Sequence, residues 1–219
     1  MTMKAANFID ASVAAYTITH TTRPDDVLLG LAEETARATG GDAIMQISPE
    51  QGTLLTMLVQ ISGARRAMEV GTFTGYSSIC IARGLPEDGE LIACDLSDEW
   101  TSVARRYWEK AGVSDRIELR LGPAAETLRA MPRKEFVDFA FIDADKVGYP
   151  VYYEEIMARL VPGGLICVDN TLQSGAIIDL DAGGSVPAMR RFNDLVASDE
   201  RVTTILLPVA DGLTLIRKR

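Results

Sequence analysis

The sequence predicts an α/β protein: a doubly wound sheet of seven strands, mostly parallel, that ends in an antiparallel hairpin and follows a group of N-terminal helices. Three observations carry this prediction. Short apolar runs alternate with amphipathic helical segments from residue 66 onward, which is typical of βαβ units and a mostly parallel sheet. The last two runs are separated only by residues 208–212, too short a connection for a parallel crossover. The length of 219 residues suits one α/β domain.

The expected elements follow one another in order along the chain. Helical patterning with polar breaks runs through residues 2–39 and ends at a glycine turn. The next helix is expected to begin at Ser48, where Ser48 can cap, Pro49 takes the first helical position and Gln51 can reach back as in a capping box. The strands are expected at residues 67–70, 91–94, 117–121, 136–142, 165–168, 202–207 and 213–216. The helices between them are expected at residues 76–83, 98–111, 123–131, 150–160 and 186–198.

The composition limits the classes of protein to which the chain can belong. A net charge of −9 argues against non-specific binding to nucleic acid, which needs a cationic surface. No apolar run approaches the ~20 residues that cross a bilayer, and the N-terminus lacks the apolar block of a signal peptide. Three cysteines within apolar stretches indicate free thiols in a reducing compartment. We therefore expect a cytoplasmic protein with no nucleic-acid or membrane partner.

Polar residues after the first two strands of the sheet suggest a nucleoside site. The turn at residues 71–75 resembles a dinucleotide fingerprint, but Phe73 and Tyr76 stand where glycines should admit a pyrophosphate. Asp95, at the end of the second strand, can accept the hydroxyls of a ribose. Glu69 suits a ligand with positive charge, so S-adenosylmethionine fits these residues better than NAD. The alternative is that Glu69 and Asp95 only cap turns or pair with basic neighbours.

A second polar group follows the fourth and fifth strands. Asp143 and Lys146 follow the fourth strand, and Asp169 and Asn170 follow the fifth, so we expect them at one edge of the sheet. Their oxygen atoms would suit a hard cation such as Mg²⁺, with Mn²⁺ or Ca²⁺ as alternatives. Lys146 could accept the proton of an acceptor hydroxyl near this cation. The alternative is ordinary turn chemistry for the acids and a solvated surface lysine.

These residues resemble the cation-dependent O-methyltransferases, class I enzymes with a Rossmann-like sheet that include caffeoyl-CoA and catechol O-methyltransferases. The resemblance rests on six motifs in order, at residues 48–52, 69–77, 85–89, 141–146, 163–164 with 169–170, and 211–214. It implies S-adenosylmethionine as co-substrate, a homodimer, a helical cover over residues 1–45 and a catalytic core over residues 46–219. By this resemblance the metal ligands are Asp143, Asp169 and Asn170, with Lys146, Asp143 and Asn170 catalytic. The donor contacts are Ile47, Glu69, Gly71, Thr72, Ser77, Asp95, Ala124, Asp143 and Asp145.

The expected acceptor is a small aromatic molecule with a free hydroxyl. Plant-type members of the family carry Trp and Asn where this chain has Gln173 and Ser174. A coenzyme A thioester brings phosphates that need Lys or Arg, yet residues 171–188 contain none. We therefore expect a catechol or hydroxy-arene. The alternatives are a caffeoyl-CoA-type thioester methyltransferase, an NAD-dependent oxidoreductase, or a binding module that keeps the donor site without turnover.

Overall fold

Seven strands form one sheet: β1 (Arg66–Val70), β2 (Glu90–Asp95), β3 (Ile117–Leu121), β4 (Val137–Ile142), β5 (Leu160–Val168), β6 (Val202–Leu207) and β7 (Leu213–Lys218). In this computed structural model, which describes residues 10–219, their order is β3-β2-β1-β4-β5-β7-β6. β1 to β5 pair in parallel, whereas β7 pairs antiparallel with β5 and β6. The predicted doubly wound sheet with its antiparallel C-terminal hairpin is confirmed.

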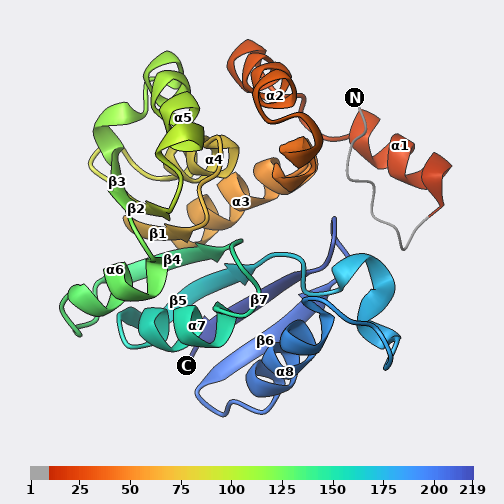
Figure 1. Ribbon diagram of the computed structural model, residues 1–219. Helices are drawn as coiled ribbons and strands as arrows, with labels where there is room; N and C mark the ends of the chain where they lie inside the picture. Colours follow the sequence, from red (N-terminus) through yellow and green to blue (C-terminus); the bar gives the residue numbers. More distant parts are fainter. Residues whose placement is uncertain (1–9) are drawn as a thin grey trace.

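Helices cover both faces of this sheet (Figure 1). On one face lie α3 (Pro49–Ser62), α4 (Tyr76–Gly84) and α5 (Asp98–Ala111), and on the other α6 (Ala124–Ala130), α7 (Tyr149–Met157) and α8 (Val186–Ala197). Successive strand residues point to opposite faces, so Phe139 and Phe141 join one apolar cluster while Ala140 and Ile142 join the other. Two short 3₁₀ turns, η2 (Ser114–Arg116) and η3 (Gln173–Ile178), complete the connections.

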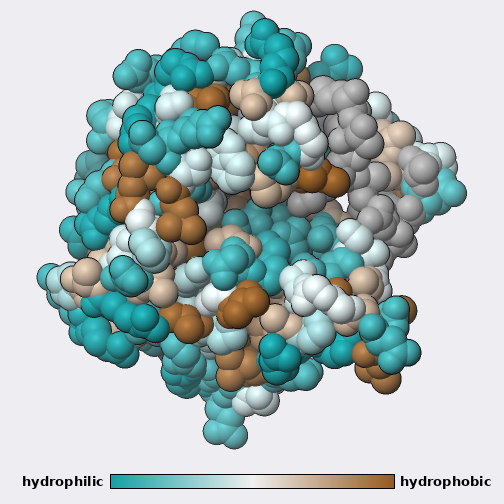
Figure 2. Space-filling model, in the orientation of Figure 1, coloured by the Kyte–Doolittle hydropathy of each residue, from teal (hydrophilic) through white to brown (hydrophobic). Residues whose placement is uncertain are grey.

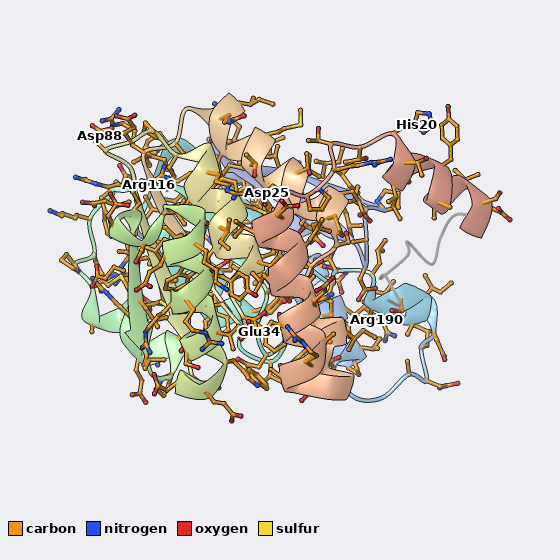
Figure 3. All side chains as sticks on the ribbon, turned by 90° about the horizontal axis from the view of Figure 1, so that it is seen from above. His20, Asp25, Glu34, Asp88, Arg116 and Arg190 are labelled. Atoms are coloured by element: carbon orange, nitrogen blue, oxygen red, sulfur yellow. The ribbon has the colours of Figure 1, made fainter. Side chains whose placement is uncertain are left out.

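The N-terminal elements are α1 (Ala11–Thr19), α2 (Asp26–Thr39) and η1 (Gly40–Met45). α1 stands away from the sheet, whereas α2 lies beside α5 (Figure 1). Tyr107 of α5 donates a hydrogen bond to the carbonyl of Gly30 at 2.9 Å, and Glu34 points from α2 toward α5 (Figure 3). α2 therefore packs against the layer that covers one face of the sheet.

Several predicted boundaries and contacts differ from the structure. The expected helix over residues 150–160 ends at Met157, because β5 begins at Leu160, which already pairs with Val137 of β4. Helices occupy 11–19 and 26–39 of the expected helical stretch 2–39, and residues 2–9 of it lie outside the described part. Within residues 10–219, no helix combines the length and apolar character needed to cross a membrane.

The predicted capping box at the start of α3 is wrong. Ser48 is the residue that precedes the helix and Pro49 takes its first position, as expected, but the Ser48 hydroxyl makes no capping hydrogen bond. The side chain of Gln51 is fully buried and makes no hydrogen bond with the described residues. Gln51 points into the protein instead of back along the chain, which a local motif could not reveal.

Candidate active site

A cavity of about 550 Å³ opens at the carboxyl ends of the parallel strands. In Figure 2 it is the hollow in the middle of the face, with a largely hydrophilic floor and apolar residues on its rim. Its size suits a ligand as large as a nucleoside derivative. Every predicted site residue except Glu69 and Asp169 lines it: Ile47, Gly71, Thr72, Ser77, Asp95, Ala124, Asp143, Asp145, Lys146 and Asn170.

The turn after β1 forms one wall of the cavity and touches the end of β4. Gly71 has a φ of +94°, and a Cβ there would come within 1.9 Å of the carbonyl oxygen of Asp143. The backbone amide of Gly71 also donates to the carbonyl of Cys94 at 3.0 Å, and that of Asp143 to Val70 at 2.8 Å. This close approach brings the ends of β1, β2 and β4 into one surface.

Asp95 holds the same turn through its carboxylate. The backbone amides of Thr72 and Phe73 both donate to Asp95 Oδ2 at 2.8 Å, and that of Ser97 donates to Oδ1 at 2.8 Å. An ionised carboxylate offers about four acceptor positions, so roughly one is left for a ligand. Asp95 therefore has the predicted place in the cavity, with capacity for one ribose hydroxyl where two had been expected.

Glu69 lies beneath the cavity, not in its wall. Its side chain is fully buried on β1, and Ser78 donates a hydrogen bond to one of its carboxylate oxygens. Burial raises the pKa of Glu69 to about 7, because a charged carboxylate loses its water there. Glu69 is not among the residues that line the cavity, so its predicted contact with the donor stays a prediction.

Asp145 is held at the cavity wall by two neighbours. The hydroxyl of Tyr152 donates to Asp145 Oδ1 at 2.5 Å, and the backbone amide of Gly148 donates to Oδ2 at 2.9 Å. Burial and the Asp145 carboxylate raise the pKa of Tyr152, so its hydroxyl stays protonated and keeps donating. Asp145 thus presents a carboxylate of defined orientation to the cavity.

Lys146, which follows β4, contacts polar side chains that follow both β4 and β5. Its Nζ donates to Asp143 Oδ1 at 3.0 Å, to Tyr149 Oη at 2.7 Å and to Asn170 Oδ1 at 2.6 Å. The Lys146 and Asp143 side chains are only 17% and 15% exposed. β4 and β5 are neighbours in the sheet, which confirms the predicted meeting of these residues at one edge.

Asp169 and Asn170 continue β5 into this edge. Asp169 is fully buried, and its Oδ1 accepts the backbone amide of Asn170 at 2.7 Å. Asn170 has a φ of +60°, a conformation that Asn tolerates better than most residues. No three His, Cys, Asp or Glu side chains gather as a metal site among residues 10–219. The predicted ligand set contains only two acids, and its third member is an amide.

No aromatic residue was expected at the site from the sequence, but Phe73, Tyr76, Trp100 and Tyr152 line the cavity and Tyr149 contacts Lys146. Phe73 and Trp100 meet edge to face in the cavity wall, with ring centroids 4.9 Å apart. Tyr149 and Tyr152 hold Lys146 and Asp145 from α7. A three-residue spacing of two tyrosines on one helix face is equally typical of core packing, so no local signal distinguishes Tyr149 and Tyr152 as site residues.

The fold and the cavity define a class of protein. An open parallel sheet with its cavity at the carboxyl ends is typical of nucleotide- and nucleoside-binding enzymes. The Phe73 side chain, at a φ of +52°, stands where a pyrophosphate would need glycine. The site therefore suits a nucleoside-containing co-substrate without phosphate groups.

Comparison with known proteins identifies the family. The sequence profile of a family described as O-methyltransferase matches residues 18–219. Probable caffeoyl-CoA O-methyltransferase 2 of Dictyostelium discoideum is 38% identical over 212 residues, covering 94% of this chain and 91% of that protein. Tricin synthase 1 of Oryza sativa subsp. japonica is 40% identical over 189 residues, covering 80% and 75%.

Solved structures agree with this assignment. The O-methyltransferase from Bacillus cereus in complex with SAH has a TM-score of 0.87 at 34% identity, covering 95% of this chain and 97% of that one. TomG from Streptomyces achromogenes, involved in tomaymycin synthesis and solved with SAM, has a TM-score of 0.84 at 32% identity, covering 94% and 96%. The chain belongs to the O-methyltransferase family and is an S-adenosylmethionine-dependent transferase. This membership argues against the NAD-dependent oxidoreductase alternative.

Proposed function

We propose that this enzyme methylates a hydroxyl group of a small catechol-type or hydroxy-aromatic acceptor beside a bound divalent cation. The cation we propose is Mg²⁺. The observation that carries the proposal is the convergence of Asp143 Oδ1 and Asn170 Oδ1 on the cationic Nζ of Lys146. Carboxylate and amide oxygens are also the ligands that a hard cation prefers. This point lies at the edge of the cavity that would hold the donor.

The cation would be held by Asp143, Asp169 and Asn170. Carboxylate and amide oxygens are the ligands that Mg²⁺ prefers, and Mn²⁺ and Ca²⁺ also accept them. A divalent cation supplies charge that lowers the pKa of an acceptor hydroxyl, which for a phenol lies near 10. The absence of a histidine from the site fits this choice, because His20, the one histidine of the sequence, is exposed and directly follows α1, far from the sheet (Figure 3).

Lys146 is proposed as the base. A hydroxyl that enters between Asp143 and Asn170 meets the Lys146 nitrogen, which would take its proton in the neutral amine form. The oxygen then bonds to the methyl carbon, and the sulfonium sulfur keeps the electron pair of the broken C–S bond. The donor is already activated, so the main contribution of the protein is to align oxygen, carbon and sulfur.

S-adenosylmethionine fits the cavity by chemistry. It carries a ribose, an ammonium and a sulfonium, and no phosphate. The remaining acceptor position of Asp95 would take a ribose hydroxyl, and the oriented carboxylate of Asp145 would face positive charge. The relatives from B. cereus and S. achromogenes, solved with SAH and SAM, support this assignment.

The acceptor is proposed to be a free aromatic hydroxyl compound. Residues 171–188 contain no Lys or Arg, and Arg190, on the next helix, donates to the carbonyls of Ile177 and Asp179 (Figure 3). The phosphates of a coenzyme A thioester would therefore find little positive charge here. The thioester remains the second candidate, because the names of the relatives from D. discoideum favour it.

One assay tests both parts of the proposal. Methyl transfer from S-adenosylmethionine is measured with catechol, caffeate, dihydroxybenzoate and caffeoyl-CoA, each with EDTA and after Mg²⁺ is added back. EDTA is expected to abolish turnover and Mg²⁺ to restore it, with the free catechols preferred. Turnover that survives EDTA would contradict the cation, and a strong preference for caffeoyl-CoA would contradict the acceptor. The homodimer and the cytoplasmic location expected from the sequence stay predictions.

A further inference from the structure

The Asp211 carboxylate joins the β6–β7 turn to the polar edge of the sheet. Asn170 Nδ2 donates to Asp211 Oδ2 at 3.1 Å, and the backbone amide of Ser174 donates to Asp211 Oδ1. Asp211 belongs to the motif at residues 211–214 that the family resemblance singled out, and the proposed chemistry gives it no role. Its two oxygens contact a predicted cation ligand and the loop that borders the acceptor.

The Asn170 side chain stands between a donor and an acceptor that cannot exchange roles. The Lys146 ammonium only donates hydrogen bonds, and an ionised Asp211 carboxylate only accepts them. Asn170 Oδ1 must then face Lys146 at 2.6 Å, and Nδ2 must face Asp211 at 3.1 Å. The reverse orientation would place a donor against the ammonium and an oxygen against the carboxylate. Asp211 therefore selects one of the two amide orientations.

We propose that Asp211 is a positioning residue that aims the Asn170 oxygen, and not its nitrogen, at the point where the cation binds. This inference rests on the proposed function for the cation itself. An amide nitrogen turned toward that point would repel a cation and remove one of its three ligands. Residues that orient metal ligands in this way affect metal affinity by about 10–100-fold.

The alternative is that Asp211 serves only to fold the turn. The main chain already docks the turn, because the amides of Thr171 and Leu172 donate to the carbonyls of Gly212 and Asp211, both at 3.0 Å. A Cβ on Gly212 would come within 2.5 Å of the Leu172 nitrogen, so the two backbones are in close contact. The Asp211 carboxylate is thus available for orienting Asn170 without carrying the fold.

Asp211→Asn reverses this selection while keeping the shape of the side chain. The introduced amide has one oxygen. The backbone amide of Ser174 is a fixed donor, so this oxygen is expected to stay directed at Ser174. The introduced amide nitrogen then faces Asn170, whose oxygen turns toward it and away from the cation. Mn²⁺ affinity, measured by electron paramagnetic resonance of the free ion, is expected to fall about 10–100-fold. The control is Asp181→Asn, which removes the same charge from an exposed position without contact to Asn170.

The exchanged pair Asn170→Asp with Asp211→Asn separates orientation from folding. The carboxylate introduced at position 170 can accept from the amide introduced at position 211 with one oxygen and face the cation with the other, and the net charge is unchanged. This double variant is expected to regain most of the Mn²⁺ affinity that Asp211→Asn loses. A purely structural role would give no such rescue. Full affinity in Asp211→Asn, or no rescue in the double variant, would overturn the proposal.

A readout without metal distinguishes this inference from the proposed function. The side-chain amide protons of Asn170 bond to a carboxylate in the wild type, and their NMR signals and solvent exchange report that bond. Asp211→Asn is expected to shift these signals and to change their exchange. If the wild type binds no Mn²⁺, the proposed cation site is contradicted, and the NMR measurement still decides whether Asp211 orients the Asn170 amide. Unchanged amide signals in Asp211→Asn would overturn the inference even if the cation binds.

Discussion

Asp95 and Asp145 each hold a piece of main chain and line the donor cavity at the same time. Asp95 accepts three backbone amides, and Asp145 accepts one together with the Tyr152 hydroxyl. Each carboxylate is oriented by these bonds before any ligand arrives, which reduces the entropy lost on binding. At the scale of single residues, structural and binding roles therefore share the same atoms, and a substitution at either position would affect both.

Lys146 can be tested as a base by changing its proton affinity and keeping its charge. Lys146→Arg retains a cation, but a guanidinium does not give up its proton near neutral pH. We expect kcat to fall about 10²–10⁴-fold, the range for losing general base catalysis, with the donor affinity unchanged. Turnover with catechol and calorimetric titration with S-adenosylmethionine measure the two effects. Lys110→Arg on the exposed side of α5 is the control, and an unaltered kcat in Lys146→Arg would contradict the role.

Glu69 makes the stability of the protein depend on pH. Its pKa is about 7 in the folded protein, above the ordinary 4.5, so the folded state holds a proton that the unfolded chain has lost. Stability therefore falls as pH rises from about 4.5 to about 7, by about 3 kcal/mol. Glu69→Gln stays neutral and is expected to lack this loss in urea unfolding across that range, whereas exposed Glu87→Gln should retain it. If the free energy of unfolding depends on pH in the same way in the wild type and in Glu69→Gln, Glu69 is not the group responsible for this loss.

The elements of the site meet because the ends of β1, β2, β4 and β5 are in register. Val70 pairs with Cys94 and with Ile142, and Ile142 pairs with Val168. The residue after each of these strands then emerges at the same height, which brings Asp143 and Asp169 to one edge. At the scale of elements, strand order and register decide which polar residues become neighbours.

Gly71 is a point where the ends of β1 and β4 approach closely. Gly71→Ala must overcome both a positive φ and a Cβ overlap with the Asp143 carbonyl, so we expect a loss of about 3–5 kcal/mol in the free energy of unfolding. Gly63→Ala is the matched control, since Gly63 has a φ of +66° and nothing within 4 Å of the added Cβ. It should cost about 1–2 kcal/mol. If the two variants lost the same free energy of unfolding in urea, the backbone around Gly71 and Asp143 would have to move apart at little cost.

At the scale of the whole molecule, α2 is tied to the turn at residues 71–75 and to α4. Thr35 of α2 donates to the hydroxyl of Thr74 at 2.8 Å, and both side chains are buried. Asp25, at the start of α2, forms an ion pair with Arg83 of α4 at 2.7 Å. Residues on η1 and at Ile47 also line the cavity. Movement of α2 or η1 would therefore reach the cavity.

Removing the Thr35–Thr74 hydrogen bond tests the link between α2 and the turn at residues 71–75. Thr35→Val leaves a buried hydroxyl without its partner, so the free energy of unfolding is expected to fall by about 1–3 kcal/mol. We also expect weaker binding of S-adenosylmethionine in calorimetry, because the turn at residues 71–75 loses its tie to α2. A double-mutant cycle with Thr74→Val should give a coupling of about 1 kcal/mol, and Thr204→Val on β6 is the control. Additive effects of the two substitutions would contradict the link.

Several features could be predicted from the sequence because their signals are local. The spacing of apolar runs, the short connection at residues 208–212 and the polar residues after each strand depend only on neighbours along the chain. They were sufficient for the seven strands, the hairpin and the meeting of Asp143, Lys146 and Asn170 at one edge of the sheet. Ile47, Ser77 and Ala124 were expected in the cavity only from the family resemblance. The local signals failed at Ser48 and Gln51, where a local capping motif competes with burial of the Gln51 side chain.

The sequence by itself determined the kinds of residue that end each strand, and hence the chemistry available to the site. Only the tertiary structure decided how these residues are used. It turned Glu69 inward, committed most of Asp95 to backbone amides, and gave Lys146 its oxygen partners. The physical reason is distance along the chain: Asn170 takes its orientation from Asp211, 41 residues away. Contacts of this kind follow from strand order and packing, which no local pattern encodes.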